Sequence, residues 1–290
     1  MIYSSFPPSV YLFTSLFFNL NSLLKNKYRV KILDIQKPRR KDVKFIKGNI
    51  LNKSIIRSAL KDIDIIFHLA AVSDINKVKD IPKKTVETNI LGTTNLLEEA
   101  RRKNIKRFIF ASSVYSYGRA GNLYTTSKQS SELIIKNYGL LFGIKFTILR
   151  YTTAYGPRNR AVDAISIFVQ RALKNLDLII HGNGQQKRDY LYVEDLANGS
   201  LLALKNKTKN KTITLASKNN IKIIDLAKII IKLTNSKSKI IFDKKNKRID
   251  DFSSKYNYNN YEKTLYNWKP KYSMVKGLNK YIKEKYNLLT

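Results

Sequence analysis

The chain has 290 residues, enough for one large domain or two smaller ones with a sizeable apolar core. It has no cysteine, which excludes disulfides, a thiolate metal site and a cysteine nucleophile, and its two histidines argue against a histidine-based metal site. The formal net charge of +34 comes from basic residues scattered through every segment, with no arginine-rich arm. This distribution favours a solvated basic surface over a nucleic-acid-binding one.

The first 24 residues do not follow the regular pattern of the rest of the chain. Their apolar run is too short, and too often interrupted by Ser, Thr and Asn, to cross a bilayer. It also lacks the basic start and the cleavage site of a secretory signal. We therefore expect a cytoplasmic protein with no membrane segment.

From residue 28 onward, predicted strands and helices alternate. Short runs rich in β-branched and apolar residues predict strands at 28–34, 43–49, 63–71, 106–113 and 145–151. Apolar residues at helical spacing predict helices at 85–104 and 126–143. This alternation predicts an α/β fold with a doubly wound parallel sheet.

The alternation loosens after Tyr155-Gly156-Pro157. A helix at 164–175 and a strand at 176–182 are followed by a turn rich in Gly, Asn and Gln and by further mixed elements. We expect a first domain over residues 1–156 and a smaller mixed lobe over 157–290, with some of its segments returning to the first domain.

The segment SSVYSYGRAGNLYTTSK (112–128) holds a serine pair and a tyrosine four residues before a lysine. The spacing Tyr-x-x-x-Lys occurs at Tyr124/Lys128, Tyr272/Lys276 and Tyr281/Lys285, which is about the number that chance gives in this composition, so the spacing alone is uninformative. The first pair differs by its place, because it follows a predicted strand ending at Ser113 and opens a helix. At that place the ammonium of Lys128 would favour the phenolate form of Tyr124. The alternative is that the pair lies on an ordinary surface helix.

Seven strings in a common order resemble the extended short-chain dehydrogenase/reductase family, in its NAD-dependent nucleotide-sugar epimerase/dehydratase branch. They are FHLAA (67–71), TNILGTTNLLEEA (88–100), ASSVYSYG (111–118), YTTSK (124–128), LRYTTAYGPR (149–158), GNGQQKRDYLYVEDLA (182–197) and NWKPKYS (267–273). The resemblance implies a Rossmann-like first domain that binds NAD, a lobe that binds a nucleotide-diphosphate sugar, and a homodimer. It implies catalytic roles for Ser113, Tyr124 and Lys128.

The resemblance also implies binding residues. Asp34, at a strand end, matches the acid that binds the adenosine ribose and favours NAD over NADP; the alternative is a solvated loop acid. The other implied cofactor contacts are Asn49, Ile50, Leu69, Ala70, Ala71, Asn89, Tyr124, Lys128 and Tyr151. The implied substrate contacts are Ser113, Thr153, Arg188 and Arg248, with the two arginines facing the diphosphate unless they are plain surface charges. His68 is expected to be structural.

Several features depart from the family pattern. The glycine-rich loop expected about 20 residues before Asp34 is missing, since Gly48 is the first glycine in the chain. Without those glycines the backbone cannot approach a pyrophosphate closely, so weak NAD binding is expected. One hypothesis is that the first 20 or so residues are a wrong start or an out-of-frame reading. The loop between Gly118 and Tyr124 is short, and Thr153 replaces a common Asn.

One departure narrows the reaction. Dehydratase relatives carry an Asp-Glu pair after the strand-end Ser or Thr, whereas Val114 and Tyr115 stand here and neither replaces a carboxylate. The sequence therefore favours an NAD-dependent epimerase, acting through a 4-keto sugar, or a keto-reductase. The competing hypotheses are a catalytically silent Rossmann-like binding protein and a basic nucleic-acid binder.

Overall fold

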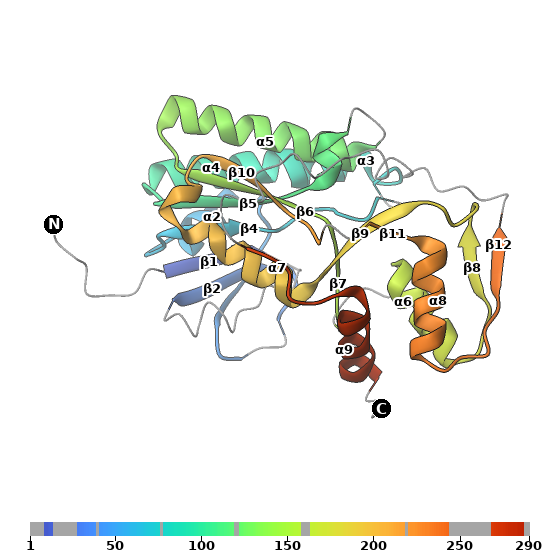
Figure 1. The fold of residues 1–290 in the computed structure, drawn as a ribbon. Coiled ribbons are helices and arrows are strands. Elements are labelled where there is room, and N and C mark those ends of the chain that lie inside the picture. Colours follow the sequence, from blue (N-terminus) through green and yellow to red (C-terminus); the bar gives the residue numbers. More distant parts are fainter. Residues whose placement is uncertain are drawn as a thin grey trace. The chain divides into compact units, whose positions relative to one another are not determined.

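The structure is a computed structural model that describes residues 9–13, 28–38, 41–75, 78–118, 122–157, 163–217, 220–243 and 268–286, without the side chains of 9–13. The chain forms two compact units (Figure 1). Unit 1 comprises Met1–Arg150 and Ser200–Thr214, and unit 2 comprises Tyr151–Gly199 and Leu215–Thr290. Among the described residues we find no helix with both the length and the apolar character needed to span a bilayer.

A seven-stranded sheet forms the centre of unit 1, in the order β10-β6-β5-β4-β1-β2-β3. The strands are β1 (Ser9–Phe13), β2 (Arg29–Asp34), β3 (Lys44–Lys47), β4 (Ile65–His68), β5 (Arg107–Ser113), β6 (Phe146–Tyr151) and β10 (Lys211–Leu215). The pairs from β3 to β5 are parallel. The predicted doubly wound parallel α/β fold is therefore confirmed.

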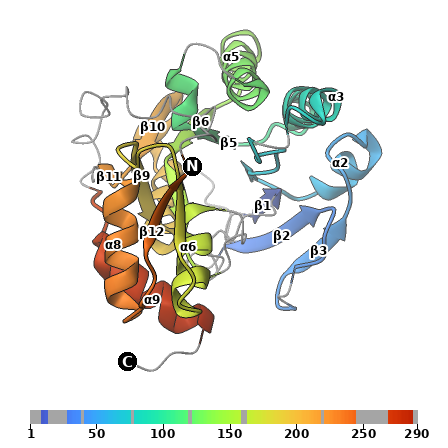
Figure 2. The ribbon, with the colours of Figure 1, turned by 90° about the vertical axis from the view of Figure 1, so that its right-hand side faces the viewer.

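Helices cover this sheet and close the main core. Helices α2 (Lys53–Ala59), α4 (Gly92–Arg102) and α5 (Leu123–Phe142) lie side by side along one face (Figure 2). Their apolar residues meet those of the buried strands, and the core includes Ile56, Leu96, Phe108, Ile135 and Ile148. This burial is the main favourable term that holds the strand ends in place.

The inner strand β1 was not predicted from the sequence. Val10 pairs with Val30 of β2 on one side and with Ile65 of β4 on the other. The run SVYLF is β-branched and aromatic, as strands usually are. This strand corrects the interpretation that the first 24 residues all lie outside the pattern, whereas residues 14–27 lie outside the described residues.

Two local features shape the helices near the strand ends. The helix predicted over 85–104 is divided into α3 (Pro82–Val86), a π-helical turn η1 (Glu87–Leu91) and α4. Such single π turns occur frequently at functional sites. Helix α5 is capped by Asn122, whose Oδ1 accepts from the Thr125 amide at 2.9 Å, and ends at Gly143 with φ +70°.

The segment Ser200–Thr214 belongs to unit 1 and is tied into it by a buried cation. It contains the short 3₁₀ turns η3 (Leu201–Leu204) and η4 (Asn206–Thr208) and most of β10. The Nη1 of Arg107 donates to Thr147 Oγ1 at 3.0 Å, to the Ala203 carbonyl at 2.9 Å and to Thr208 Oγ1 at 3.3 Å. One side chain therefore links β5, β6 and the returning segment.

Unit 2 is a smaller mixed α/β body. It has a three-stranded sheet, in the order β11 (Asn220–Lys222), β9 (Lys187–Tyr192), β7 (Thr153–Tyr155), and a two-stranded one of β12 (Ile240–Asp243) and β8 (Leu178–His181). Its helices are α6 (Ala164–Leu173), α7 (Val193–Ser200), α8 (Ile223–Leu233) and α9 (Met274–Tyr286). Gly277 has no room for a Cβ because the Tyr155 hydroxyl lies against it, so the glycine lets α9 pack closely on β7.

Candidate functional site

Ser113, Tyr124 and Lys128 come together where strand β5 ends and helix α5 begins. Ser113 hydrogen-bonds the phenol of Tyr124. One turn along the helix, Lys128 Nζ lies 5.8 Å from the centre of the Tyr124 ring. A 3₁₀ turn, η2 (Val114–Tyr117), follows Ser113 directly, and its Tyr115 ring stands edge-on to that of Tyr124 at 6.4 Å between centroids. The three predicted side chains therefore share one small region of unit 1.

Lys128 is almost completely buried, with 3% of its surface exposed. Its Nζ donates to the Ala111 carbonyl at 2.7 Å and lies 4.6 Å from the centre of the Phe110 ring. Burial lowers the pKa of Lys128 to about 7, although the negative charge of Glu132 acts to raise it. The ammonium is therefore only partly charged at neutral pH.

Tyr124 differs from the sequence-based expectation of an acidified phenol. Burial raises the pKa of Tyr124 to about 12; the hydrogen bond from Ser113 lowers it and the nearby Tyr115 raises it further. Burial acts on Tyr124 and Lys128 together, and the half-neutral amine is too weak a charge to offset it. In the protein alone the phenol is therefore protonated at neutral pH.

Asn89 braces the site from the π-helical turn. Its Nδ2 donates to Ser127 Oγ at 2.9 Å and to the Val72 carbonyl at 3.0 Å, and its Oδ1 accepts from the Val72 amide at 2.8 Å. Ser127 precedes Lys128 on α5. The side chain of Asn89 therefore links α5 to the segment after β4, which holds the buried Leu69 and the half-buried Ala70 and Ala71.

His68 ends strand β4 and is buried. Its Nε2 lies 2.8 Å from Thr93 Oγ1, which in turn donates to the Asn89 carbonyl at 2.6 Å. Burial, with a smaller contribution from the charge of Lys128, lowers the pKa of His68 to about 3. This histidine is neutral at physiological pH, and its contacts are those of a structural residue.

The predicted adenosine-side residues lie at the carboxyl ends of β2 and β3. Asp34 is the last residue of β2 and is half-buried; its Oδ1 accepts from the Gln36 amide at 2.9 Å. Burial raises the pKa of Asp34, and backbone amides partly offset this. Asn49 Oδ1 accepts from the Leu51 amide at 2.9 Å, and the buried Ile50 packs against Gly92, where a Cβ would overlap it.

The predicted substrate-side residues belong to unit 2, apart from Ser113. Thr153 begins β7 and pairs with Tyr190 of β9, and Arg188 lies two residues earlier on β9, so strand alternation puts it on the same face as Tyr190. Arg188 is half-buried. Tyr151, a predicted cofactor contact, is the last residue of β6 and is half-buried as well. Arg248 lies outside the described residues.

A second Ser/Tyr/Lys set shows why spacing alone identifies nothing. In unit 2, Lys285 Nζ donates to the Tyr281 hydroxyl at 3.0 Å, and that hydroxyl donates to Ser166 Oγ at 3.2 Å. Tyr281 has 0% exposure and packs in the apolar core of the unit. A tyrosine enclosed in this way meets no substrate, so we assign no chemistry to it.

Known proteins bear out the family resemblance seen in the sequence. Residues 19–216 match the model of the NAD dependent epimerase/dehydratase family. A putative UDP-glucose 4-epimerase of Methanocaldococcus jannaschii is 32% identical over 248 residues, 78% of this chain and 81% of that protein. The chain belongs to the NAD-dependent epimerase/dehydratase family. The predicted resemblance is thereby confirmed.

Other members of the family widen the comparison. A UDP-N-acetyl-alpha-D-glucosaminuronate decarboxylase of Bacillus cytotoxicus is 31% identical over 69% of this chain and 68% of that protein. The structure of a UDP-glucose 4-epimerase from Thermotoga maritima, solved with UDP-glucose, superposes with a TM-score of 0.89 at 23% identity over 96% of this chain and 99% of that chain, which shows the fold. A Bacillus cereus UDP-glucuronic acid 4-epimerase, solved with UDP-glucuronic acid and NAD, gives 0.82 at 26% identity over 97% and 100%.

The family's NAD can be tested against the residues that this structure describes. Half-buried Asp34 stands at a strand end with a carboxylate oxygen bonded to backbone, which suits a ribose, and the half-buried residues after β4, Ala70 and Ala71, have small side chains. The phenol of Tyr124 and the buried amine of Lys128 are the groups that would meet the nicotinamide end. The stretch between β1 and β2 contains no glycine. The chemistry of these described side chains therefore fits the ribose and nicotinamide ends of NAD, whereas the sequence lacks the glycines of the family's pyrophosphate loop.

Sequence reasoning missed the polar residues that support the site in this family member. Glu132, one turn beyond Lys128, is buried and forms a two-pronged pair with Arg150. Ser112 donates to the same carboxylate. The available signal was an acid four residues after the lysine, on the same face of the predicted helix, which predicts a partner for a buried cation.

Proposed function

We propose that the protein is an NAD-dependent nucleotide-sugar epimerase that oxidises its sugar to a 4-keto intermediate and reduces it again on the other face. The observation that supports this most strongly is the joining of Ser113, Tyr124 and Lys128 at the end of β5, in a member of this family. A keto-reductase would use the same three side chains without returning the hydride to the same substrate.

In the proposed reaction, Tyr124 removes the proton of the sugar hydroxyl while the carbon beneath it loses hydride. Ser113 donates a hydrogen bond to that oxygen as it becomes a carbonyl, and Lys128 holds a positive charge beside the phenolate. Bound NAD⁺ would supply the hydride acceptor, the later hydride donor and a positive nicotinamide charge. That charge counters the burial that otherwise keeps Tyr124 protonated.

The turn after Ser113 supports epimerisation over loss of water. Elimination needs a carboxylate acid/base beside the sugar, and η2 offers Val114 and Tyr115 at the two positions that follow the serine. The buried carboxylate of Glu132 is already engaged by Arg150 and Ser112. The described part of the site therefore lacks a free carboxylic acid for elimination or decarboxylation chemistry.

A nucleotide-diphosphate sugar is the proposed substrate class. Arg188, half-buried on β9, would offer a forked cation for the diphosphate, with Thr153 on the neighbouring strand β7. Arg248 keeps its proposed role from the sequence. These assignments are tested by a panel of UDP-, GDP- and dTDP-sugars, in which Arg188→Ala should raise KM for the true substrate more than it lowers kcat.

The deciding experiment is product analysis by proton NMR on that panel in heavy water. We expect the C4 epimer to appear without deuterium at C4, because hydride returns directly. No conversion of any sugar, together with no saturable NADH fluorescence signal, would instead support a catalytically silent binding protein. The missing glycines and the protonated Tyr124 make that second candidate worth this test.

We also propose that the protein is a homodimer and that it is located in the cytoplasm, as expected from the sequence. Helix α5 exposes large apolar side chains, notably Leu140 at 83% and Leu141 at 71%, with Leu133 and Phe142 also exposed. Apolar side chains gathered on one helix favour burial against another chain. Light scattering should give twice the monomer mass, and replacing Leu140 and Leu141 with Lys should return a monomer.

A further inference from the structure

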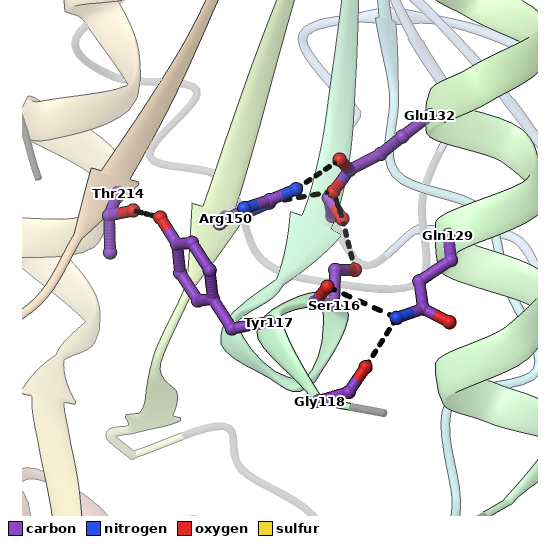
Figure 3. A network of polar contacts seen from close by, with 8 residues as sticks. Ser116, Tyr117, Gly118, Gln129, Glu132, Arg150 and Thr214 are labelled. Atoms are coloured by element: carbon purple, nitrogen blue, oxygen red, sulfur yellow. Dashed lines mark hydrogen bonds and ion pairs between the residues drawn. The ribbon is translucent and has the colours of Figure 1, made fainter. Parts of the chain in front are cut away.

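A buried polar network joins helix α5, strand β6 and the turn after Ser113, through groups that the proposed reaction does not itself use (Figure 3). Its centre is Glu132 on α5, with 3% of its side chain exposed. Arg150 of β6 binds both carboxylate oxygens, through Nε at 2.9 Å and Nη2 at 2.6 Å. Such a two-pronged contact fixes the orientation of the carboxylate as well as its position.

The carboxylate of Glu132 also binds Ser112, next to Ser113 at the end of strand β5. Ser112 Oγ donates to Glu132 Oε1 at 2.5 Å and lies 3.0 Å from Ser116 Oγ. Ser112 and Ser116 stand on either side of the first residues of η2. The network therefore holds both ends of the turn that begins with Ser113.

Two further contacts fix the rest of that turn. Gln129 Nε2 donates to the carbonyls of Ser116, at 3.2 Å, and of Gly118, at 2.5 Å (Figure 3). Tyr117 lies with its ring 4.2 Å from the guanidinium carbon of Arg150, and its hydroxyl is 2.5 Å from Thr214 Oγ1. Helix α5 thus presents, on successive turns, Lys128 to the site and Gln129 and Glu132 to the loop that follows Ser113.

We propose that Glu132 is the positioning residue of the Ser113/Tyr124/Lys128 set: held by Arg150, it fixes the strand end through Ser112 and supplies the negative charge that Lys128 faces. Glu132 lies one helical turn from Lys128, on the same side of α5. This inference deepens the proposed function and rests on it for its catalytic consequence.

The charges around Lys128 support the assignment. From α5 itself, Tyr124 is neutral and Glu132 is the anion that acts on Lys128. On β4, His68 is neutral, with a pKa of about 3. On β5, the lysine contacts the Ala111 carbonyl and the Phe110 ring, neither of which is charged. Arg150 on β6 is also positively charged, but its guanidinium is paired with the carboxylate of Glu132.

The test is a titration that needs no turnover. In the full-length protein carrying ¹³Cε-labelled lysine, Lys128 should give the signal that moves near pH 7, and Lys128→Arg should remove that signal. In Glu132→Gln the midpoint should fall by about one pH unit, because the opposing charge is lost. The matched control is Glu99→Gln, which removes another buried carboxylate, paired with Arg57 at 3.1 Å, and should leave the midpoint where it was.

Kinetics then separate a positioning role from a merely structural one. In Glu132→Gln the acid limb of the rate profile should move to lower pH as the plateau falls, whereas a loss of packing alone lowers the plateau without moving the limb. Ser112→Ala keeps the charge and removes the link to the strand, so kcat should drop about tenfold with an unmoved Lys128 midpoint.

The outcomes remain distinguishable. A midpoint that Glu132→Gln leaves unchanged overturns this proposal even in an active epimerase. A midpoint that moves in a protein without turnover upholds the charge assignment and overturns the proposed function instead. If Glu132→Gln does not fold, Ser112→Ala decides the matter, and an unchanged kcat in that variant refutes the positioning role.

Discussion

The ammonium nitrogen of Lys128 lies 5.8 Å from the centre of the Tyr124 ring and 2.7 Å from the Ala111 carbonyl oxygen. This geometry ties the lysine to the strand that ends in Ser113 as firmly as to the tyrosine on its own helix. It is also a costly arrangement, because a mostly apolar environment surrounds a group that is charged in water.

Removal of the Tyr124 hydroxyl should lower turnover strongly. We expect Tyr124→Phe to lower kcat about 10³-fold, since a positioned general base contributes that much, while NADH binding persists. The control is Tyr281→Phe, which removes the hydroxyl of the other tyrosine–lysine contact, between Tyr281 and Lys285. Steady-state kinetics on both variants settle the assignment, and equal losses of activity would argue against it.

The rate should rise with pH through about 7 or slightly below. Lys128, with a pKa of about 7, gives up the first proton of the pair, and Tyr124, at about 12, the second. The active form, phenolate with ammonium, carries the same number of protons as the form with both groups neutral, so its population grows as the first proton leaves. A profile of kcat/KM against pH checks this, and an acid limb above pH 8 would contradict it.

Replacing the buried lysine should stabilise the protein at neutral and lower pH. The folded state lowers the pKa of Lys128 from 10.5 to about 7, so the unfolded chain binds more protons between these values and stability rises with pH across that window. Lys128→Met removes this penalty, which is about 5 kcal/mol below pH 7. Urea unfolding at pH 6.5 and pH 9.5 should show a gain that shrinks at the higher pH.

Cofactor preference should depend on Asp34. Asp34→Asn is expected to weaken NADH binding about tenfold and NADPH binding much less, because a carboxylate accepts from a ribose hydroxyl and repels a 2′-phosphate. Fluorescence titration of both dinucleotides measures this. Equal losses for the two would mean that Asp34 is only a strand-end acid bonded to the Gln36 amide.

Removing the buried guanidinium of Arg107 should destabilise the fold of unit 1 without changing kcat. Arg107→Met leaves Thr147, Thr208 and the Ala203 carbonyl without their shared donor, and we expect a cost of about 3 kcal/mol in the free energy of unfolding. Equilibrium urea unfolding gives the value. A change below about 0.5 kcal/mol would show that water replaces the guanidinium at no cost.

The sequence predicted the sheet well where its strands are nearly all apolar or β-branched, as at Ile65–His68 and Arg107–Ser113. It did not predict Ser9–Phe13, because the glycine loop that normally marks the first strand is missing. The sequence also predicted one continuous helix over 85–104, whereas Asn89 lies in a π-helical turn. Apolar periodicity is averaged over a window of residues, so it does not detect the one extra residue of a single π turn.

The candidate site was predictable only as far as local pattern reaches. Tyr124, Lys128 and Ser113 were placed by their position relative to a strand and a helix, and their catalytic roles stay predictions. The partnership of Glu132 with Arg150 joins residues 18 apart on different elements, which no local pattern encodes. The protonation of Tyr124 was also missed, because burial depends on neighbours from β5 and η2 that the sequence does not place quantitatively.

The return of Ser200–Thr214 to unit 1 has a consequence for synthesis. A ribosome delivers Arg107 long before its partners Ala203 and Thr208, and in the meantime it has also delivered residues 151–199 of the other unit. The outer edge of β6 therefore stays uncovered until β10 emerges, and an uncovered edge invites pairing with another chain. Unit 1 therefore cannot complete its fold before residues 200–214 are synthesised, and a nascent chain stalled near residue 150 would be prone to aggregate.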